Sequence, residues 1–181
     1  MADVLNENPQ LGAVGCQIRN TDGTLQPSVG RFPTIPNLII NRLPLVKTWL
    51  SSYFICAPWY YRRARSPDWL MGACLMVRKT AFDAVGGLDE GFFLYGEDVD
   101  LCYRLRQDGW NLRYLPQVWT IHHDEGKTLP RRLNKFIHMR RGLIRFYARH
   151  YSPAALRRLK VLFGVELTLR RWFNRDQQWR A

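Results

Sequence analysis

Three carboxylates, those of Glu97, Asp98 and Asp100, fall within four residues, directly after an aromatic loop that contains several glycines. Asp98 also heads an apolar stripe at helical spacing, which continues through Leu101, Cys102 and Leu105. The pattern predicts a helix that begins near these acids and turns Asp98 toward the interior. Burial raises the pKa of a carboxylate, and a carboxylate whose pKa lies near neutral pH can serve as a general base.

The neighbouring Asp100 stands four residues before Arg104, a spacing at which the two side chains can pair on another face of the same helix. We therefore expect a structural role for Asp100 and a chemical one for Asp98. A simpler interpretation is that all three acids only stabilise the start of a surface helix and have no chemical role. Acids in a first turn complement the helix dipole.

The surrounding residues favour the chemical interpretation. Residues 86–93 read Gly-Gly-Leu-Asp-Glu-Gly-Phe-Phe, and residues 96–105 read Gly-Glu-Asp-Val-Asp-Leu-Cys-Tyr-Arg-Leu. This motif resembles the second half of family 2 glycosyltransferases, which have the GT-A fold, and within them the bacterial rhamnosyltransferases. The resemblance extends from about residue 8 to about residue 151 and implies an α/β fold, a partial GT-A (Rossmann-like) domain.

The resemblance implies that a sugar moves, with inversion, from a nucleotide diphosphate donor to an acceptor hydroxyl of a cell-envelope or lipid-linked glycan. Rhamnose is the sugar that it favours. By the same resemblance Asp98 is the catalytic base, and Glu97 positions the acceptor or holds the loop. The acceptor side of the cleft is then expected to include Trp69, Gly72, Ala73, Asp89 and Glu90.

Two adjacent histidines, His122 and His123, follow the last predicted strand. In the resembling enzymes a histidine at this position helps to hold a divalent cation, together with an Asp-x-Asp motif at the end of an earlier strand. Imidazole and carboxylate suit Mn²⁺, and Mg²⁺ can bind through water. Either histidine could be the ligand, and the alternative is a histidine pair in a polar loop without a metal.

The family's nucleotide-binding half has no counterpart in this sequence. No Asp-x-Asp motif and no strand–helix repeat precede Gly12, while Asp98-Val99-Asp100 has that pattern only within the motif of the base. We therefore expect the C-terminal half of a GT-A domain, either as a truncated product or as a chain that needs a separate N-terminal half as its partner. The resemblance does not by itself imply catalysis by this chain alone.

The basic charge of the sequence is concentrated at one end. Residues 1–125 carry 12 Lys and Arg and 13 Asp and Glu, whereas residues 126–181 carry 15 and 2. We expect two domains, 1–128 and 129–181, of which the second is a tail of two basic amphipathic helices. Such a tail suits an anionic membrane surface, and it predicts a cytoplasmic protein held peripherally on the inner face of the cell membrane.

Two other interpretations of the tail remain open. Its charge would also attract the phosphates of a nucleic acid, but charge alone supports this, because the sequence shows no helix-turn-helix, zinc-finger or RNA-recognition motif. The tail could also dock to another subunit, which would make the chain a non-catalytic module.

The composition bounds the protein class. The 181 residues, 46% of them apolar, can bury a core of single-domain size. Four widely spaced cysteines without a C-x-x-C pair predict reduced, buried thiols rather than a zinc site or disulfides. The N-terminus lacks the basic and apolar regions of a signal peptide, and no apolar run is long enough to cross a bilayer.

The elements that must position the acids follow from apolar runs and turn signals. The expected order is helix 2–8, strand 12–18, an irregular segment 27–67, strand 68–77, helix 79–85, a helix from the acids to residue 109, strand 112–121, and helices 131–151 and 153–173. Five prolines interrupt the irregular segment before it ends at a sixth, Pro67, and its length is typical of a binding loop or lid.

Overall fold

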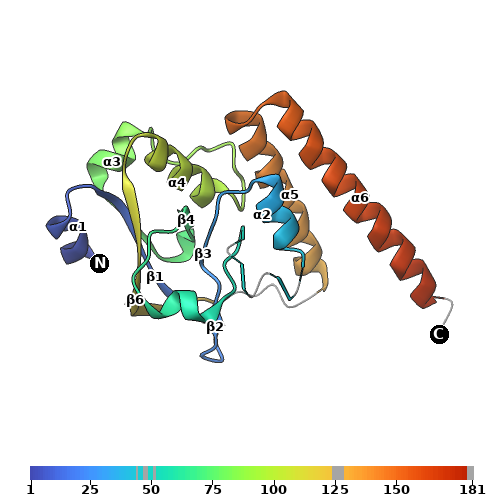
Figure 1. The fold of residues 1–181 in the computed structure, drawn as a ribbon. Coiled ribbons are helices and arrows are strands. Elements are labelled where there is room, and N and C mark those ends of the chain that lie inside the picture. The colour runs from blue at the N-terminus through green and yellow to red at the C-terminus, as the bar shows by residue number, and fades with distance from the viewer. Residues whose placement is uncertain (44, 47–48, 51, 124–128, 179–181) are drawn as a thin grey trace. The chain divides into compact units, whose positions relative to one another are not determined.

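The computed structural model describes residues 1–43, 45–46, 49–50, 52–123 and 129–178, which form a mixed α/β structure (Figure 1). The chain divides into two compact units, Met1–Gly142 and Leu143–Ala181. This division falls inside a helix, whereas the sequence predicted a change at residues 128 and 129. The predicted position borders residues 124–128, which lie outside the described part of the chain.

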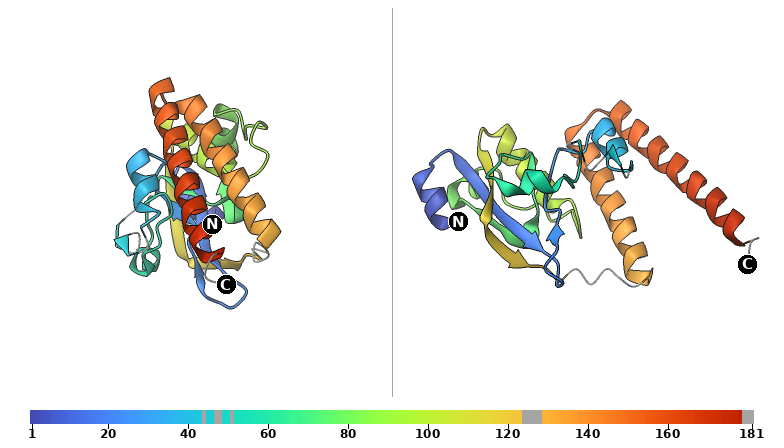
Figure 2. Two further views of the ribbon diagram at one scale, coloured as in Figure 1. Left: turned by 90° about the vertical axis from the view of Figure 1, so that its right-hand side faces the viewer. Right: turned by 60° about the horizontal axis from the view of Figure 1, so that its bottom comes forward.

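The main sheet of the first unit is organised around strand β1 (Leu11–Arg19). Strand β6 (Asn111–Ile121) runs parallel to it, as the right-hand view of Figure 2 shows. The short strands β2 (Leu25–Gln26) and β5 (Leu75–Val77) pair with it in the antiparallel sense. Because β1 has neighbours along most of its length and apolar cover, nearly all of its residues are buried.

A second, two-stranded sheet joins β3 (Val29–Gly30) to β4 (Trp69–Leu70). The sequence predicted one continuous strand over residues 68–77, and this prediction is wrong. The chain leaves the small sheet after β4, makes a 3-10 turn at Gly72–Cys74 (η3), and joins the main sheet as β5. An apolar run cannot show such a change of partner, because both strands are equally apolar.

Helices complete the core of the first unit. Helix α1 (Ala2–Glu7) packs its Leu5 against apolar side chains of β1 and β6. Helix α3 (Lys79–Ala84) follows β5, and helix α4 (Glu97–Gln107) packs against β4 and β6. The predicted inward stripe of α4 is confirmed: Leu101, Cys102 and Leu105 are buried.

The irregular segment 27–67 is held to the core despite its few regular elements. It contains helix α2 (Ile35–Ile40) and a 3-10 helix, η2 (Pro58–Arg62). The buried Tyr61 hydroxyl donates to the carbonyl oxygen of Ile55 at 2.7 Å and accepts from the backbone N–H of Ser28 at 3.0 Å. These bonds hold the described residues around Tyr61 in one conformation.

Helix α5 (Leu129–His150) crosses from the first unit to the second, and helix α6 (Pro153–Gln178) forms the rest of the second unit. Ser152 caps the start of helix α6, because its hydroxyl accepts from the N–H of Ala155 at 3.3 Å. The core of this unit consists of Leu143, Phe146, Tyr147, Leu159 and Phe163. Among the described helices, none combines the length and the apolar character needed to cross a membrane.

The four cysteines are thiols. Cys16 and Cys102 are buried, as the sequence predicted, but Cys56 and Cys74 are only half-buried.

Candidate active site

A cavity of about 470 Å³ lies beside the first turn of helix α4, within the first unit. It brings together six residues that the sequence placed in the site: Trp69, Gly72, Ala73, Glu97, Asp98 and His122. They come from strand β4, the 3-10 turn η3, helix α4 and the end of β6, so only the fold assembles them.

Asp98 is half-buried at the wall of this cavity. The backbone N–H of Gly72 donates to its Oδ2 at 2.9 Å, and the N–H of Val99 donates to its Oδ1 at 2.8 Å. Burial raises the pKa of Asp98 to about 6, and the nearby charge of Glu97 also raises it, against the opposing effect of these hydrogen bonds. The carboxylate is thus fixed in position, yet it can take up a proton near neutral pH.

Glu97 lies next to Asp98 on the wall of the cavity. Its Oε2 atom is buried, and no group in the described part of the chain forms a hydrogen bond with it. A buried oxygen without a partner is costly, so this atom is available to a hydroxyl group of a bound ligand.

Asp100 occupies the core side of the same helical turn and is fully buried. Its Oδ2 accepts from Arg104 Nε at 2.8 Å and lies 2.7 Å from Arg104 Nη2, which confirms the predicted pair. Arg104 also donates to the carbonyl oxygen of Val85. The sequence singled out Asp98 as the inward carboxylate, but Asp100 is the more deeply buried of the two, because its partner cation is buried with it.

The lining of the cavity also contains Tyr53 and Trp69, whose ring centroids lie 5.4 Å apart. The indole N–H of Trp69 donates to the carbonyl oxygens of Tyr53, at 3.0 Å, and Arg31, at 3.1 Å. Burial raises the pKa of the Tyr53 hydroxyl, and the charges of Asp98 and Glu97 add to the effect, so this hydroxyl remains a neutral donor. The sequence analysis missed Tyr53, because only the fold brings it to the acidic turn.

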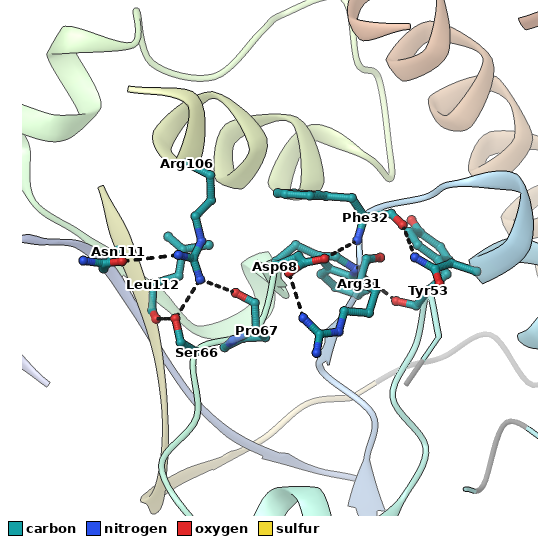
Figure 3. A network of polar contacts seen from close by, with 11 residues as sticks. Arg31, Phe32, Tyr53, Ser66, Pro67, Asp68, Arg106, Asn111 and Leu112 are labelled. Atoms are coloured by element: carbon teal, nitrogen blue, oxygen red, sulfur yellow. Dashed lines mark hydrogen bonds and ion pairs between the residues drawn. The ribbon is translucent and has the colours of Figure 1, made fainter. Parts of the chain in front are cut away.

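A network of polar contacts fixes the segment on either side of Trp69 (Figure 3). Asp68 accepts from Arg31 Nη1 at 3.1 Å and from the backbone N–H of Phe32 at 3.0 Å. Arg106, on helix α4, donates to the carbonyl oxygen of Pro67 at 2.9 Å. These bonds tie the irregular segment to helix α4, which carries the acids. They therefore hold together the parts of the chain that line the cavity.

The loop before helix α4 has a constrained backbone. Tyr95 has φ 67° and Gly96 has φ 104°, both in the left-handed region. Gly142 of helix α5 packs directly on this loop, because a Cβ atom added to it would lie 2.0 Å from the carbonyl oxygen of Tyr95. The sequence analysis did not single out Gly142, although a glycine inside a predicted helix is itself a signal of close packing.

The two histidines differ in position. His122 lines the cavity, and its Nδ1 lies 3.2 Å from the side-chain oxygen of Gln26. His123 is exposed and does not line the cavity. No group of three or more His, Cys, Asp or Glu side chains that could hold a metal occurs in the described part of the chain. These residues therefore offer a single imidazole to a cation, not a complete metal centre.

Asp89 and Glu90 lie in the preceding loop and do not line the cavity. The Oδ1 atom of Asp89 accepts from the backbone N–H of Gly91 at 2.9 Å and so stabilises the turn, while Glu90 is exposed. Lys135, which the sequence analysis assigned to the tail, does line the cavity, and its Nζ lies 5.8 Å from the centroid of the Tyr95 ring. It adds a cation opposite the acids.

Comparison with known proteins finds similarity over most of this chain. The model of a family described as "Glycosyl transferase family group 2" matches residues 50–179. An N-acetylglucosaminyl-diphospho-decaprenol L-rhamnosyltransferase of Mycobacterium tuberculosis is 38% identical over 136 residues, which cover 71% of this chain and 42% of the relative. The rhamnosyltransferase WbbL of Escherichia coli is 35% identical over 53% of this chain and 34% of its own length.

A more distant similarity extends to the archaea. A low-salt glycan biosynthesis hexosyltransferase of Haloferax volcanii is 28% identical over 56% of this chain and 26% of its own length. The aligned part of this chain thus spans less than half the length of each of these relatives.

Proposed function

Since the chain belongs to glycosyl transferase family group 2, we propose that it transfers a sugar from a nucleotide diphosphate donor to a hydroxyl group of a cell-envelope or lipid-linked glycan, with inversion. Rhamnose is the sugar proposed first, because two of the relatives are rhamnosyltransferases. The observation that carries the proposal is the position of Asp98, a carboxylate with a raised pKa at the wall of a cavity.

In the proposed reaction Asp98 removes the proton from the acceptor hydroxyl. The oxygen then attacks the anomeric carbon of the donor, and the bond from that carbon to the diphosphate breaks, so the diphosphate leaves with the electron pair. The hydrogen bonds from Gly72 and Val99 hold the carboxylate in one orientation for this transfer.

Glu97 and Tyr53 are proposed to orient the acceptor. The unpartnered Oε2 of Glu97 can accept a hydrogen bond from a second sugar hydroxyl, and the neutral Tyr53 hydroxyl can donate one. The aromatic wall formed by Tyr53 and Trp69 offers an apolar face to the sugar ring.

A divalent cation, Mn²⁺ or Mg²⁺, bound with the donor would neutralise charge on the leaving diphosphate. His122 is the residue of this chain that could contact it, and Lys135 could add positive charge at the same cavity. The remaining ligands would come from the donor phosphates and from residues outside those described, in keeping with the separate nucleotide-binding half that the sequence predicts.

We also propose that the protein is peripheral to the inner face of the cell membrane. Arg141, Arg145 and Arg149 are exposed along helix α5 at helical spacing. Helix α6 also exposes large apolar side chains, among them Val161 and Trp172. A tail that exposes both cations and apolar groups suits an anionic lipid surface, where a lipid-linked acceptor would be found.

A non-catalytic binding module is the second candidate function. The incomplete set of metal ligands in the described residues favours it, and the basic tail would then bind the membrane or a partner. Nucleic acid is not favoured, because charge alone supports it.

Two measurements test the proposal. The first is calorimetric binding of nucleoside diphosphates to the purified chain with and without Mn²⁺, which shows whether this chain contains a donor site. The second is transfer from nucleoside diphosphate rhamnose to a lipid-diphosphate N-acetylglucosamine acceptor, with the Asp98→Asn variant compared with wild type.

Loss of a general base should lower the transfer rate about 100- to 10,000-fold in Asp98→Asn. The control is Asp108→Asn at the other end of helix α4, where the side chain is exposed, and this variant should keep the wild-type rate. Equal rates for Asp98→Asn and wild type would refute the role of Asp98. Absence of both binding and transfer from the folded chain would support the module instead.

A further inference from the structure

The irregular segment has an unusual charge pattern. Together with the four residues before it, the segment spans residues 23–67, and these contain six Lys or Arg side chains and not one Asp or Glu. The segment therefore differs from the rest of the first unit, where acids and bases nearly balance, and it is positive independently of the basic tail.

The same segment exposes large apolar side chains around and after helix α2. The exposed fraction is 83% for Leu45 and 77% for Trp49, and it is lower but substantial for the other three members of the group. We call this group, Ile39, Leu43, Leu45, Trp49 and Leu50, the apolar tip. Several large apolar side chains exposed in one segment commonly mark a surface that another molecule or a membrane covers.

The base of the apolar tip is firmly attached. Leu38 is buried, and the side-chain oxygen of Asn41 accepts from the backbone N–H of Phe54 at 3.2 Å and from the Ser52 hydroxyl at 3.4 Å. The backbone N–H of Tyr53 also donates to a carbonyl oxygen of helix α2. Because Asn41, Tyr53 and Phe54 line the cavity, the base of the apolar tip forms part of the cavity wall.

We propose that the apolar tip inserts into the interfacial layer of an anionic lipid bilayer and gives the first unit a membrane contact of its own. Trp and aliphatic side chains favour this layer, and the net positive charge of residues 23–67 complements lipid phosphates. The absence of carboxylates from residues 23–67 removes the repulsion that an anionic surface would otherwise exert. This inference goes beyond the proposed function, because it assigns lipid binding to the cavity-bearing unit as well as to the tail.

The test is co-sedimentation of the full chain with vesicles of phosphatidylcholine, with and without anionic phosphatidylglycerol. The double variant Leu45→Ser/Trp49→Ser should bind the anionic vesicles about tenfold or more weakly than wild type, because it loses two apolar side chains from the interface. The matched control is Leu88→Ser, whose side chain is 50% exposed outside the apolar tip, and it should bind as wild type does.

The tail could hold the chain on vesicles strongly enough to hide this loss, so a second measurement follows Trp49 directly. Brominated lipids should quench part of the tryptophan fluorescence of the bound chain, and that part should vanish in Trp49→Phe. Unchanged quenching in Trp49→Phe would overturn the proposal and leave the apolar tip to a protein partner. Neither measurement uses donor or acceptor, so failure to bind lipid and failure to transfer sugar are separate results.

Discussion

The first turn of helix α4 has a cavity side, which carries Glu97 and Asp98, and a core side, which carries Asp100. On the cavity side Asp98 accepts from two backbone N–H groups, and burial raises its pKa to about 6. On the core side Asp100 is fully buried in an ion pair with Arg104. The ion pair with Arg104 holds Asp100 in the scaffold, whereas Asp98, with its raised pKa, can exchange a proton at the cavity.

The two sides also contribute to stability with opposite signs. Asp100 and Arg104 satisfy each other, so loss of one partner leaves a buried charge. Asp98 has a raised pKa in the folded state, so its ionisation destabilises the fold as the pH rises from about 4 to about 6. The catalytic proposal therefore predicts that the ionised Asp98 lowers the stability of the folded protein.

The largest effect is expected on the core side. Asp100→Ala should lower the free energy of unfolding by about 3–5 kcal/mol, because Arg104 would remain buried without its carboxylate. Urea unfolding followed by circular dichroism measures this loss. A loss below about 1 kcal/mol would show that Asp100 is not a structural anion and would remove the contrast between the two sides.

The next effect concerns the loop that presents both acids. Gly142→Ala should cost about 3 kcal/mol, because the new methyl group would meet the carbonyl oxygen of Tyr95. The matched control is Gly164→Ala on helix α6, where the space around the glycine is open, and this change should be neutral or slightly stabilising. Equal stabilities for the two variants would contradict the close packing of α5 on the loop.

The cavity side should respond in the opposite direction. Asp98→Asn should raise the free energy of unfolding by about 2 kcal/mol at pH 8, where the wild-type carboxylate is ionised against its raised pKa. At pH 4 the folded wild type is already protonated at Asp98, so the gain should be close to zero. Urea unfolding at both pH values tests the sign, and a variant less stable than wild type at pH 8 would contradict it.

The smallest effect on stability is expected for an ion pair with the same spacing that lies on the surface. Lys79 and Asp83 on helix α3 stand four residues apart, as Asp100 and Arg104 do, but their side chains are 81% and 56% exposed. Lys79→Ala should change the free energy of unfolding by only about 0.3 kcal/mol. A loss approaching that of Asp100→Ala would mean that burial is not what separates the two pairs.

The sequence was sufficient where a relationship is local. The helix at Glu97–Gln107, its buried stripe and the Asp100–Arg104 pair all follow from spacing within one helix, and the structure confirms them. The motif also led to the correct family. The spacing did not give the depth of the two acids correctly, because Asp100 rather than Asp98 is the fully buried one.

The sequence was insufficient where segments distant in the chain meet. The bond from Gly72 to Asp98 joins residues 26 apart and depends on the break in the predicted strand 68–77. Tyr53 and Lys135 reach the cavity from a segment without periodicity and from the predicted tail. Their positions depend on which strands pair and which helix packs on the loop, and a single sequence contains no local signal for either.

The most direct test of the account is the titration of the Asp98 carboxyl carbon by NMR in the wild-type chain, with Asp98→Asn used for assignment. The account predicts a pKa of about 6 for Asp98. A pKa of about 4 or below for Asp98 would contradict the central claim, because the cavity-side carboxylate would then be as weak a base as an ordinary surface acid.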